Sequence, residues 1–300
     1  MKRKAFGRDA GLSARMLLTG GMLGLLYVAF AAVLFSVLDV GLLPMLLIVV
    51  GLALFQYYTS DKLALLASGA KVVERNQAPE LHDMVERLCA LADLPKPKVA
   101  VIDTDVPNAF ATGRNPKHSA VAVTTGLWHR LDRREIEGVL AHELSHIANR
   151  DVLIMTLASF FAMLAGMLTR WGMFFGGGDR DRGGGLPVWA IVMLVSIVTY
   201  VLSFILIRTI SRYREYAADR GAALMTGSPE YLMSALQRIS SDMLRIPQRD
   251  LREVEAMNAF FIIPASVKSS AAELFATHPP LEKRLANLAR ISAEMGRPVA

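Results

Sequence analysis

Long apolar runs constrain this chain more than any other feature of its sequence. A helix that crosses a bilayer needs about 17 to 25 predominantly apolar residues. Hydrophobic residues make up 53% of the chain and the mean hydropathy is +0.36, and both values are high for a soluble protein. The sequence therefore predicts a membrane protein with four spanning helices, at residues 16–38, 41–57, 152–168 and 186–207.

Basic residues before the first apolar run predict the orientation of these helices. The run is longer than a signal-peptide core of about 7 to 15 residues, so we expect it to stay in the protein as the first span. The positive-inside rule then places the N-terminus in the cytosol, and two hairpins of spans return the chain there each time. We expect a multi-pass protein of the cell (inner) membrane. The basic residues are Lys2, Arg3, Lys4, Arg8 and Arg15.

The spans divide the chain into five expected parts. The two regions that follow the hairpins are expected in the cytosol, and the glycine-rich residues 176–185 are expected to be a flexible external linker. The parts are a basic tail at 1–15, a transmembrane hairpin at 16–58, a cytosolic region at 59–151, a second hairpin at 152–207 and a cytosolic region at 208–300.

Charge and cysteine content exclude two classes of protein. The net charge of +6 comes from basic residues at the N-terminus and after apolar runs rather than from one basic face, so no nucleic-acid partner is predicted. Cys89 is the single cysteine, which excludes a disulfide within the chain and a cysteine-rich zinc site. Its amphipathic surroundings predict a buried thiol.

The cytosolic regions are predicted to be mostly helical around a small β-sheet. Alternating apolar residues predict strands at 97–103 and 119–125, with residues 106–113 as a loop or an edge strand between them. A helix start is expected at residues 78–80, and further helices at 132–147 and 281–291.

The segment His142-Glu143-Leu144-Ser145-His146 predicts a zinc site. Residues four apart share one helix face, so His142 and His146 can present imidazole nitrogens to one metal ion. Glu143 projects to the side, where its carboxylate can take a proton from a water that the metal activates. This is the pattern of zinc peptidases. By chance alone it arises in roughly one chain of this length in a hundred.

A catalytic zinc needs a third protein ligand and an open position. Glu215 and Asp219 share a helix face, so one could bind the metal while the other accepts the second N–H of a ligating histidine. A solvated, charged helix below a span is the plain structural alternative for this segment. The other candidates are the remaining histidines, His82, His118, His129 and His278.

Three motifs in order along the chain carry a family resemblance. They are the His142–His146 segment, residues 211–219 after two further spans, and residues 277–284. With the N-terminal hairpin and residues 108–113, they resemble the HtpX heat-shock membrane proteases, distant relatives of the CAAX prenyl proteases. The resemblance covers most of the chain. It implies four transmembrane helices plus a cytosolic zincin-like (gluzincin) catalytic domain.

The resemblance also implies roles for individual residues. The protein would be a zinc metalloendopeptidase with one zinc per chain, and would cleave misfolded or damaged membrane proteins, and unfolded chains, in membrane protein quality control under stress. The implied ligands are His142, His146 and Glu215, with Glu143 as general base and Asp219 as hydrogen-bond partner of a ligand. Asn108, Ala109 and Phe110 would lie on a substrate-binding edge strand, and His278 and Arg284 would steady the oxyanion or a ligand.

Plainer readings of the same residues compete with these roles. His278 could cap the helix at 281–291, and Arg284 could belong to its solvated face. An intramembrane metalloprotease is disfavoured because the helix before His142 is rich in charged residues, which are costly in a bilayer. A non-enzymatic scaffold is disfavoured because Glu143 is present and no closed four-ligand site is evident.

Overall fold

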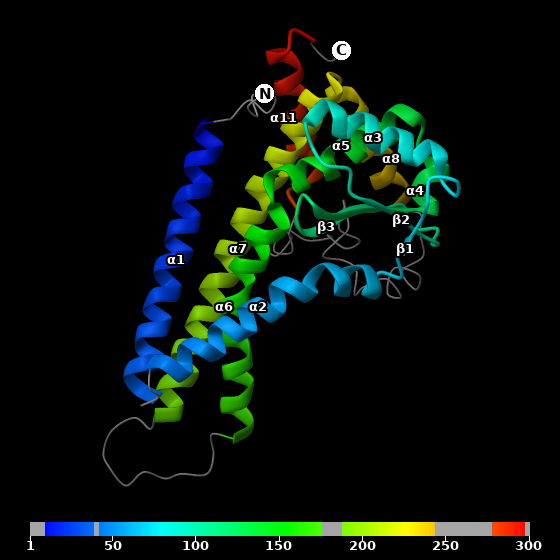
Figure 1. Cartoon of the computed structure of the whole chain (residues 1–300). Coiled ribbons are helices and arrows are strands. Elements are labelled where there is room, and N and C mark those ends of the chain that lie inside the picture. The colour runs from blue at the N-terminus through cyan, green and yellow to red at the C-terminus, as the bar shows by residue number, and fades with distance from the viewer. Residues whose placement is uncertain (1–9, 39–41, 176–187, 244–277, 298–300) are drawn as a thin grey trace. The chain divides into compact units, whose positions relative to one another are not determined.

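The computed structural model shows a mostly helical protein with one small mixed β-sheet (Figure 1). It describes residues 10–38, 42–175, 188–243 and 278–297. The expected linker at 176–185 lies outside these residues.

The chain divides into two compact units. The helical unit consists of Ser13–Tyr58 and Ile154–Ile210. Of the described residues, the α/β unit contains 10–12, Thr59–Leu153, 211–243 and 278–297. As far as they are described, the two expected hairpins fall within the helical unit except for residues 152 and 153, and the expected metal site falls within the α/β unit. The five-part division remains a prediction.

Four helices contribute to the helical unit. Its core contains Leu23 and Tyr27 of α1 with Ala158 of α6, and the Tyr27 hydroxyl donates to the Ala158 carbonyl. This bond satisfies a polar group that would be costly to leave unpaired in an apolar interior. The helices are α1 (Ala10–Leu38), α2 (Leu42–Ala67), α6 (Asp151–Phe175) and α7 (Val188–Thr226), and each has residues in the α/β unit as well.

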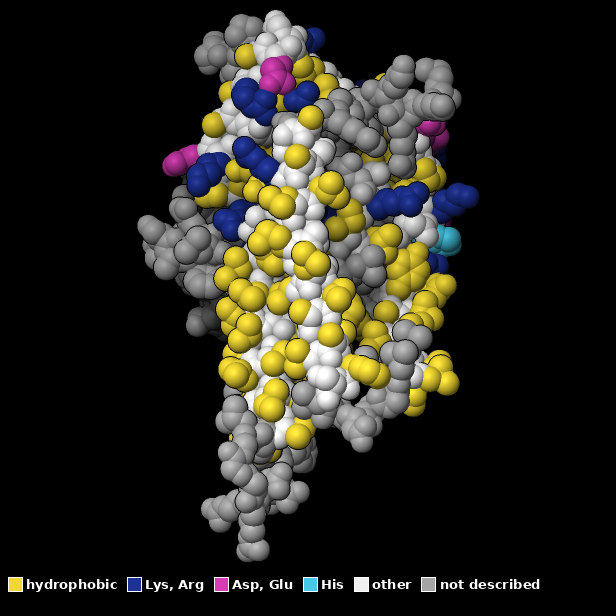
Figure 2. All heavy atoms as spheres, turned by 90° about the vertical axis from the view of Figure 1, so that its left-hand side faces the viewer, with side chains coloured by type: hydrophobic (Ala, Val, Ile, Leu, Met, Phe, Trp, Pro, Cys, Tyr) yellow, Lys and Arg dark blue, Asp and Glu magenta, His cyan; other side chains and the backbone are white. Residues whose placement is uncertain are grey.

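Three of the described helices are long and apolar enough to cross a membrane. The segments are Ala10–Ser36, Asp151–Arg170 and Val188–Thr226. They contain the third and fourth expected spans as far as these are described, and the first except for its last two residues. Figure 2, which looks onto α1, shows hydrophobic side chains spread along the helices in view. Large apolar side chains such as Leu17 are exposed, as suits a lipid-facing surface. The second expected span lies in α2, which is not among the three, so the count of four remains a prediction.

The sheet of the α/β unit has four strands in the order β1-β2-β4-β3. Strands β2 and β4 are parallel, whereas β1 and β3 each pair with their neighbour in antiparallel fashion. Strand β3 therefore forms one edge of the sheet, in the region expected as a loop or an edge strand. The strands are β1 (Lys71–Val72), β2 (Lys98–Ile102), β3 (Ala109–Asn115) and β4 (His118–Thr124).

The two faces of the sheet are covered differently. Val99, Val121 and Val123 pack into a core with α3 (Pro79–Ala92) and α5 (Arg133–Asn149), and Figure 1 shows these helices on one side of the strands. Alternate residues point the other way because the side-chain period of a strand is two. These residues, Ala100, Ile102, Phe110 and Ala122, pack against Leu65 near the end of α2.

Helix α5 begins with a complete capping box. Asp132 accepts from the amides of Arg134 and Glu135, and the Glu135 carboxylate accepts from the Asp132 amide. Glu135 also accepts from Ser234 and Arg238 of α8 (Pro229–Met243), each at 2.6 Å. The start of α5 is therefore fixed both by its own cap and by α8.

Helix α5 ends at a single residue in the left-handed conformation. Arg150 has φ 57° and its amide caps the carbonyls of His146 and Ile147. Helix α6 then begins at Asp151. The third expected span is thus a separate helix rather than a continuation of the preceding one.

The C-terminal helix α11 (Leu281–Glu294) completes the core. Leu288 and Ile291 are fully buried in the same core as α5. Helix α11 also packs against α8. The helix expected at 281–291 is therefore packed into the core through Leu288 and Ile291.

Candidate metal centre

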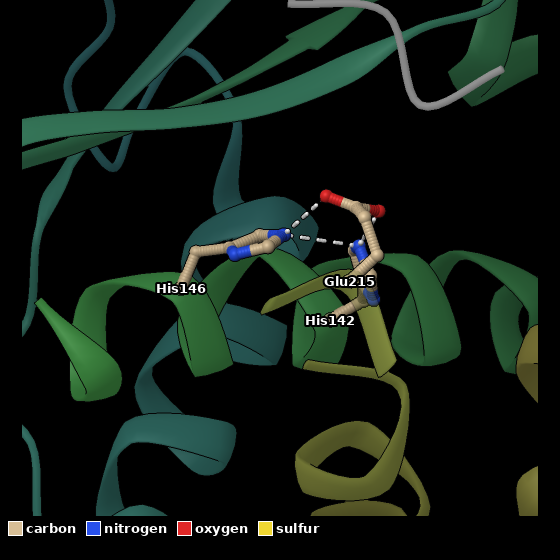
Figure 3. A group of neighbouring side chains, drawn as sticks. All are labelled: His142, His146 and Glu215. Carbon is tan, nitrogen blue, oxygen red and sulfur yellow. Dashed lines mark hydrogen bonds and ion pairs between the residues drawn. The ribbon is translucent and has the colours of Figure 1, made fainter. Parts of the chain in front are cut away.

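Two elements bring three potential metal ligands together. His142 and His146 lie one turn apart on α5, and Glu215 projects toward them from α7 (Figure 3). The Nε2 atoms of the two histidines are 3.1 Å apart. The Glu215 carboxylate oxygens Oε2 and Oε1 lie 3.5 Å from the Nε2 atoms of His142 and His146 respectively.

Hydrogen bonds at the Nδ1 atom of each histidine ring fix the direction in which its Nε2 atom points. His142 Nδ1 lies 3.0 Å from Asp219 Oδ1, and His146 Nδ1 lies 2.6 Å from Asp151 Oδ2. An ionised carboxylate only accepts, so each Nδ1 carries the proton and a neutral ring then directs its Nε2 lone pair inward. Two lone pairs 3.1 Å apart repel unless a cation lies between them.

The protonation of the cluster fits this requirement. Burial and the charge of Arg284 act to lower the pKa of His142, but its bonds to Asp219 and Glu215 outweigh them and raise it to about 9. Burial lowers the pKa of His146 to about 3. The raised pKa of His142 means that a metal ion has to compete with a proton for this side chain. The donor set of two imidazoles and a carboxylate fits a catalytic zinc ion.

His142 is positioned by a buried chain of polar contacts. Asp219, fully buried on α7, accepts from Arg284 Nε at 3.0 Å and from Nη2 at 2.6 Å. The guanidinium of Arg284 also lies 3.6 Å from the Glu215 carboxylate. Its nearly complete burial means that Arg284 does not belong to a solvated helix face.

His146 is positioned by residues that the sequence did not point to. Asp151 bonds His146 with one carboxylate oxygen and pairs with Arg214 Nη2 at 2.8 Å through the other. Asp151 follows His146 by five residues, a spacing that places two residues on different faces of a continuous helix. No sequence signal predicted the turn at Arg150 that brings them together.

Glu143 lies in the same buried site without being part of the ligand cluster. Burial and the negative charge of Glu215 raise its pKa, whereas His142 and a hydrogen bond from the Ala111 amide lower it, and the net effect is a pKa of about 7. A carboxylate with a pKa near neutrality can both accept and return a proton. The contact with Ala111 joins Glu143 to the edge strand β3.

His278 lies beside the third candidate ligand. Its Nδ1 is 2.9 Å from Glu215 Oε2. His278 does not cap α11, whose N-cap is Pro280 and has no side-chain bond. Two other histidines that the sequence offered as ligands form hydrogen bonds outside this site. His82 bonds the Val73 carbonyl, and His118 bonds the side chain of Asn115.

The expected substrate residues lie on and beside β3 with different orientations. Asn108 is buried and its backbone amide and carbonyl pair with Thr124. Ala109 faces the core that contains α5, whereas Phe110 packs into the core on the opposite face of the sheet. The side chain of Phe110 is therefore directed away from the metal centre.

Comparisons with known proteins define the class to which the chain belongs. Residues 75–292 match Peptidase family M48, and the chain belongs to this family of metalloproteases. Together with its apolar helices, this makes it a membrane metalloprotease.

Three relatives are similar to this chain over nearly their whole length. The chain is 54% identical to "Protease HtpX homolog" of Moorella thermoacetica, with 98% of each chain covered. It is 52% identical to "Protease HtpX homolog 2" of Methanosarcina acetivorans, covering 98% of this chain and 100% of the relative. It is 51% identical to "Protease HtpX homolog 1" of Streptomyces coelicolor, covering 97% and 96%. The resemblance read from the three motifs is confirmed.

A solved structure has a similar fold. The crystal structure of S. mikatae Ste24p matches with a TM-score of 0.50 and 19% identity, covering 93% of this chain and 66% of that one. The chain thus spans about two thirds of the length of that structure. At this identity the match supports the fold alone.

Proposed function

We propose that the protein is a zinc-dependent endopeptidase whose single zinc ion is held by His142, His146 and Glu215. The observation that carries this proposal is the meeting of two imidazole Nε2 atoms at 3.1 Å with a carboxylate 3.5 Å from each. When bound, zinc supplies Lewis acidity, which activates water and polarises a peptide carbonyl. Asp219 and Asp151 hold the two rings so that their Nε2 atoms face the ion.

Glu143 acts as the general base in this proposal. Its carboxylate takes the proton of the attacking water and later returns it to the amine that leaves. A pKa raised to about 7 by burial suits both steps. His278, beside Glu215, is placed to support the ligand or the developing oxyanion, and Arg284 acts through Asp219 and Glu215.

Strand β3 is the proposed docking edge for an extended substrate. Asn108 pairs with β4 through its backbone, whereas the amide of Ala111 points to Glu143, so alternate backbone groups face away from the sheet. A peptide paired with this edge would be held mainly by main-chain hydrogen bonds beside the general base. Weak sequence selectivity follows.

The proposed substrates are membrane proteins with unfolded cytosolic segments, and unfolded chains in general. The basic N-terminal tail and four spans would place the α/β unit on the cytosolic side of the inner membrane. His146 precedes the apolar part of α6 and Glu215 follows that of α7 in sequence, which supports a site close to the membrane surface. Membrane protein quality control is the corresponding cellular role.

The substitution Glu143→Gln tests the catalytic assignment. It keeps the size of the side chain and removes the base, so we expect bound zinc to remain at one per chain while hydrolysis of an unfolded protein falls by at least about a hundredfold. Zinc content by elemental analysis and cleavage of casein in detergent are the two measurements. Unchanged hydrolysis would remove Glu143 from this role.

The substrate assignment needs a separate comparison. Purified enzyme in liposomes should cleave a membrane protein with an unfolded cytosolic segment faster than the same segment supplied free in solution. Equal rates, together with unchanged lifetimes of damaged membrane proteins in cells that lack the enzyme, would contradict the proposed role.

A further inference from the structure

Asp151 links the second histidine of the metal centre to the helix that carries the third ligand. Its Oδ2 is 2.6 Å from His146 Nδ1, and its Oδ1 is 2.8 Å from Nη2 of Arg214. Arg214 immediately precedes Glu215 on α7. Both Asp151 and Arg214 are at least 95% buried.

The turn at Arg150 is what allows this contact. In a continuous helix, a residue five positions after His146 would point about 140° away from it, because each residue advances about 100°. Arg150 instead adopts φ 57°, in the left-handed region that non-glycine residues rarely occupy. The chain changes direction there, and Asp151 returns to the Nδ1 side of His146.

Two parallel chains of contacts therefore support the two histidines. His142 is held by Asp219 and Arg284, and His146 by Asp151 and Arg214. In each chain an arginine neutralises a buried carboxylate that would otherwise be costly. The second chain also fastens the junction of α5 and α6 to α7.

We propose that Asp151 and Arg214 are positioning residues for the metal centre. They hold the His146 ring with its Nε2 atom toward the ion and fix α5 against the helix that carries Glu215. This inference rests on the proposed zinc site. It differs from a purely structural ion pair, because a structural pair would support the fold without affecting metal affinity.

The test measures zinc affinity of the full-length protein in detergent by competition with a chelator. Asp151→Ala should weaken zinc binding about 10- to 100-fold, the effect usual for partners of metal-bound histidines. Asp151→Asn keeps an acceptor for His146 but loses the charge that pairs with Arg214, so a smaller loss is expected. Arg214→Met should also weaken binding, because the freed carboxylate is no longer fixed.

The absorption spectrum of the Co²⁺-loaded protein gives a second measurement, since its bands depend on ligand geometry. It should change in Asp151→Ala. The matched control is Asp61→Asn, which breaks the largely buried Asp61–Arg114 pair of the same unit, 3.2 Å long. Zinc affinity and the Co²⁺ spectrum should stay unchanged in this control.

The outcomes separate the two proposals. If Glu215→Gln binds zinc as tightly as the wild type, the proposed zinc site is wrong. If Glu215→Gln loses zinc while Asp151→Asn and Arg214→Met keep wild-type affinity and spectrum, the zinc site stands and the positioning role is overturned. The two milder variants keep the test decisive even if Asp151→Ala does not fold.

Discussion

At the scale of single residues, the metal centre depends on carboxylates that are themselves held by arginines. An imidazole can turn about its side-chain bonds, so its Nε2 atom faces a metal only when a partner fixes Nδ1. Asp219 and Asp151 supply these partners, and both are buried. The stability of the site therefore depends on Arg284 and Arg214, which keep the carboxylates charged in an apolar interior.

Arg284→Met should destabilise the protein strongly. The substitution leaves Asp219 as an uncompensated buried charge, which typically costs about 3 to 5 kcal/mol. Thermal unfolding in detergent would show a lower melting temperature. Adding Asp219→Asn to this variant should restore part of the loss, because the two residues form one pair, and strictly additive effects would contradict this coupling.

The single thiol should be unreactive in the folded protein. Burial raises the pKa of Cys89 to about 11. The folded state therefore keeps the thiol protonated up to about pH 11, whereas the unfolded chain ionises it near pH 9, so the thiol's contribution to stability is lost between these values as pH rises. A maleimide at pH 7.5 should label Cys89 only after denaturation. Rapid labelling of the native protein would show that the thiol is accessible.

At the scale of elements, the sequence predicted the helices and strands whose apolar residues recur with a regular spacing. The alternating valines of β2 and β4 and the helices α5 and α11 all lie in the predicted regions. Strand β1 has only two residues and α8 was not anticipated, because neither carries a strong local signal of its own.

The candidate site was predictable to a smaller extent. His142, Glu143 and His146 share one short motif, and Glu215 and Asp219 were recognisable as a pair with helical spacing. Asp151 could not be placed because its position depends on the left-handed conformation of Arg150, which arginine does not favour. The burial of Arg284 likewise follows from how α11 packs and not from its own sequence.

The close packing of α5 on α8 leads to a prediction for Gly138. A Cβ atom there would lie 2.6 Å from the backbone nitrogen of Leu232. Backbone atoms cannot move aside as a side chain can, so Gly138→Ala should force the helices apart and cost about 1 to 3 kcal/mol. The melting temperature should fall, and because α5 carries both histidines, zinc affinity should fall with it.

A matched control is available on α1. A Cβ atom at Gly24 would meet nothing within 4 Å. Gly24→Ala should therefore leave the melting temperature unchanged or raise it, since alanine favours helix. If both variants behaved alike, the contact between α5 and α8 would not be the cause of any loss at Gly138.

At the scale of the whole molecule, the metal centre restricts the possible membrane topologies. His142 precedes α6 and Glu215 lies near the end of α7, yet their side chains are 3.5 Å apart. If α6 and α7 span the membrane, the residues that carry these two side chains must lie on the same side of it, so the two helices would cross it as a pair. Whether the basic tail shares that side depends on α2.

The side of the membrane on which the tail lies therefore shows whether α2 crosses the membrane. If α1 and α2 both cross, the tail and residues 59–153 share the cytosolic side. If only α1 crosses, they lie on opposite sides. Single cysteines introduced by Lys4→Cys, Asp103→Cys and Glu230→Cys can report on which side of the membrane each position lies, through labelling with a membrane-impermeant maleimide. Asp103 and Glu230 are exposed, and the native Cys89 is buried.

We expect all three cysteines to be protected in intact cells and labelled in inside-out vesicles. Protection of the Lys4 reporter alone in intact cells would reject the four-span topology and place the active site outside the cytosol.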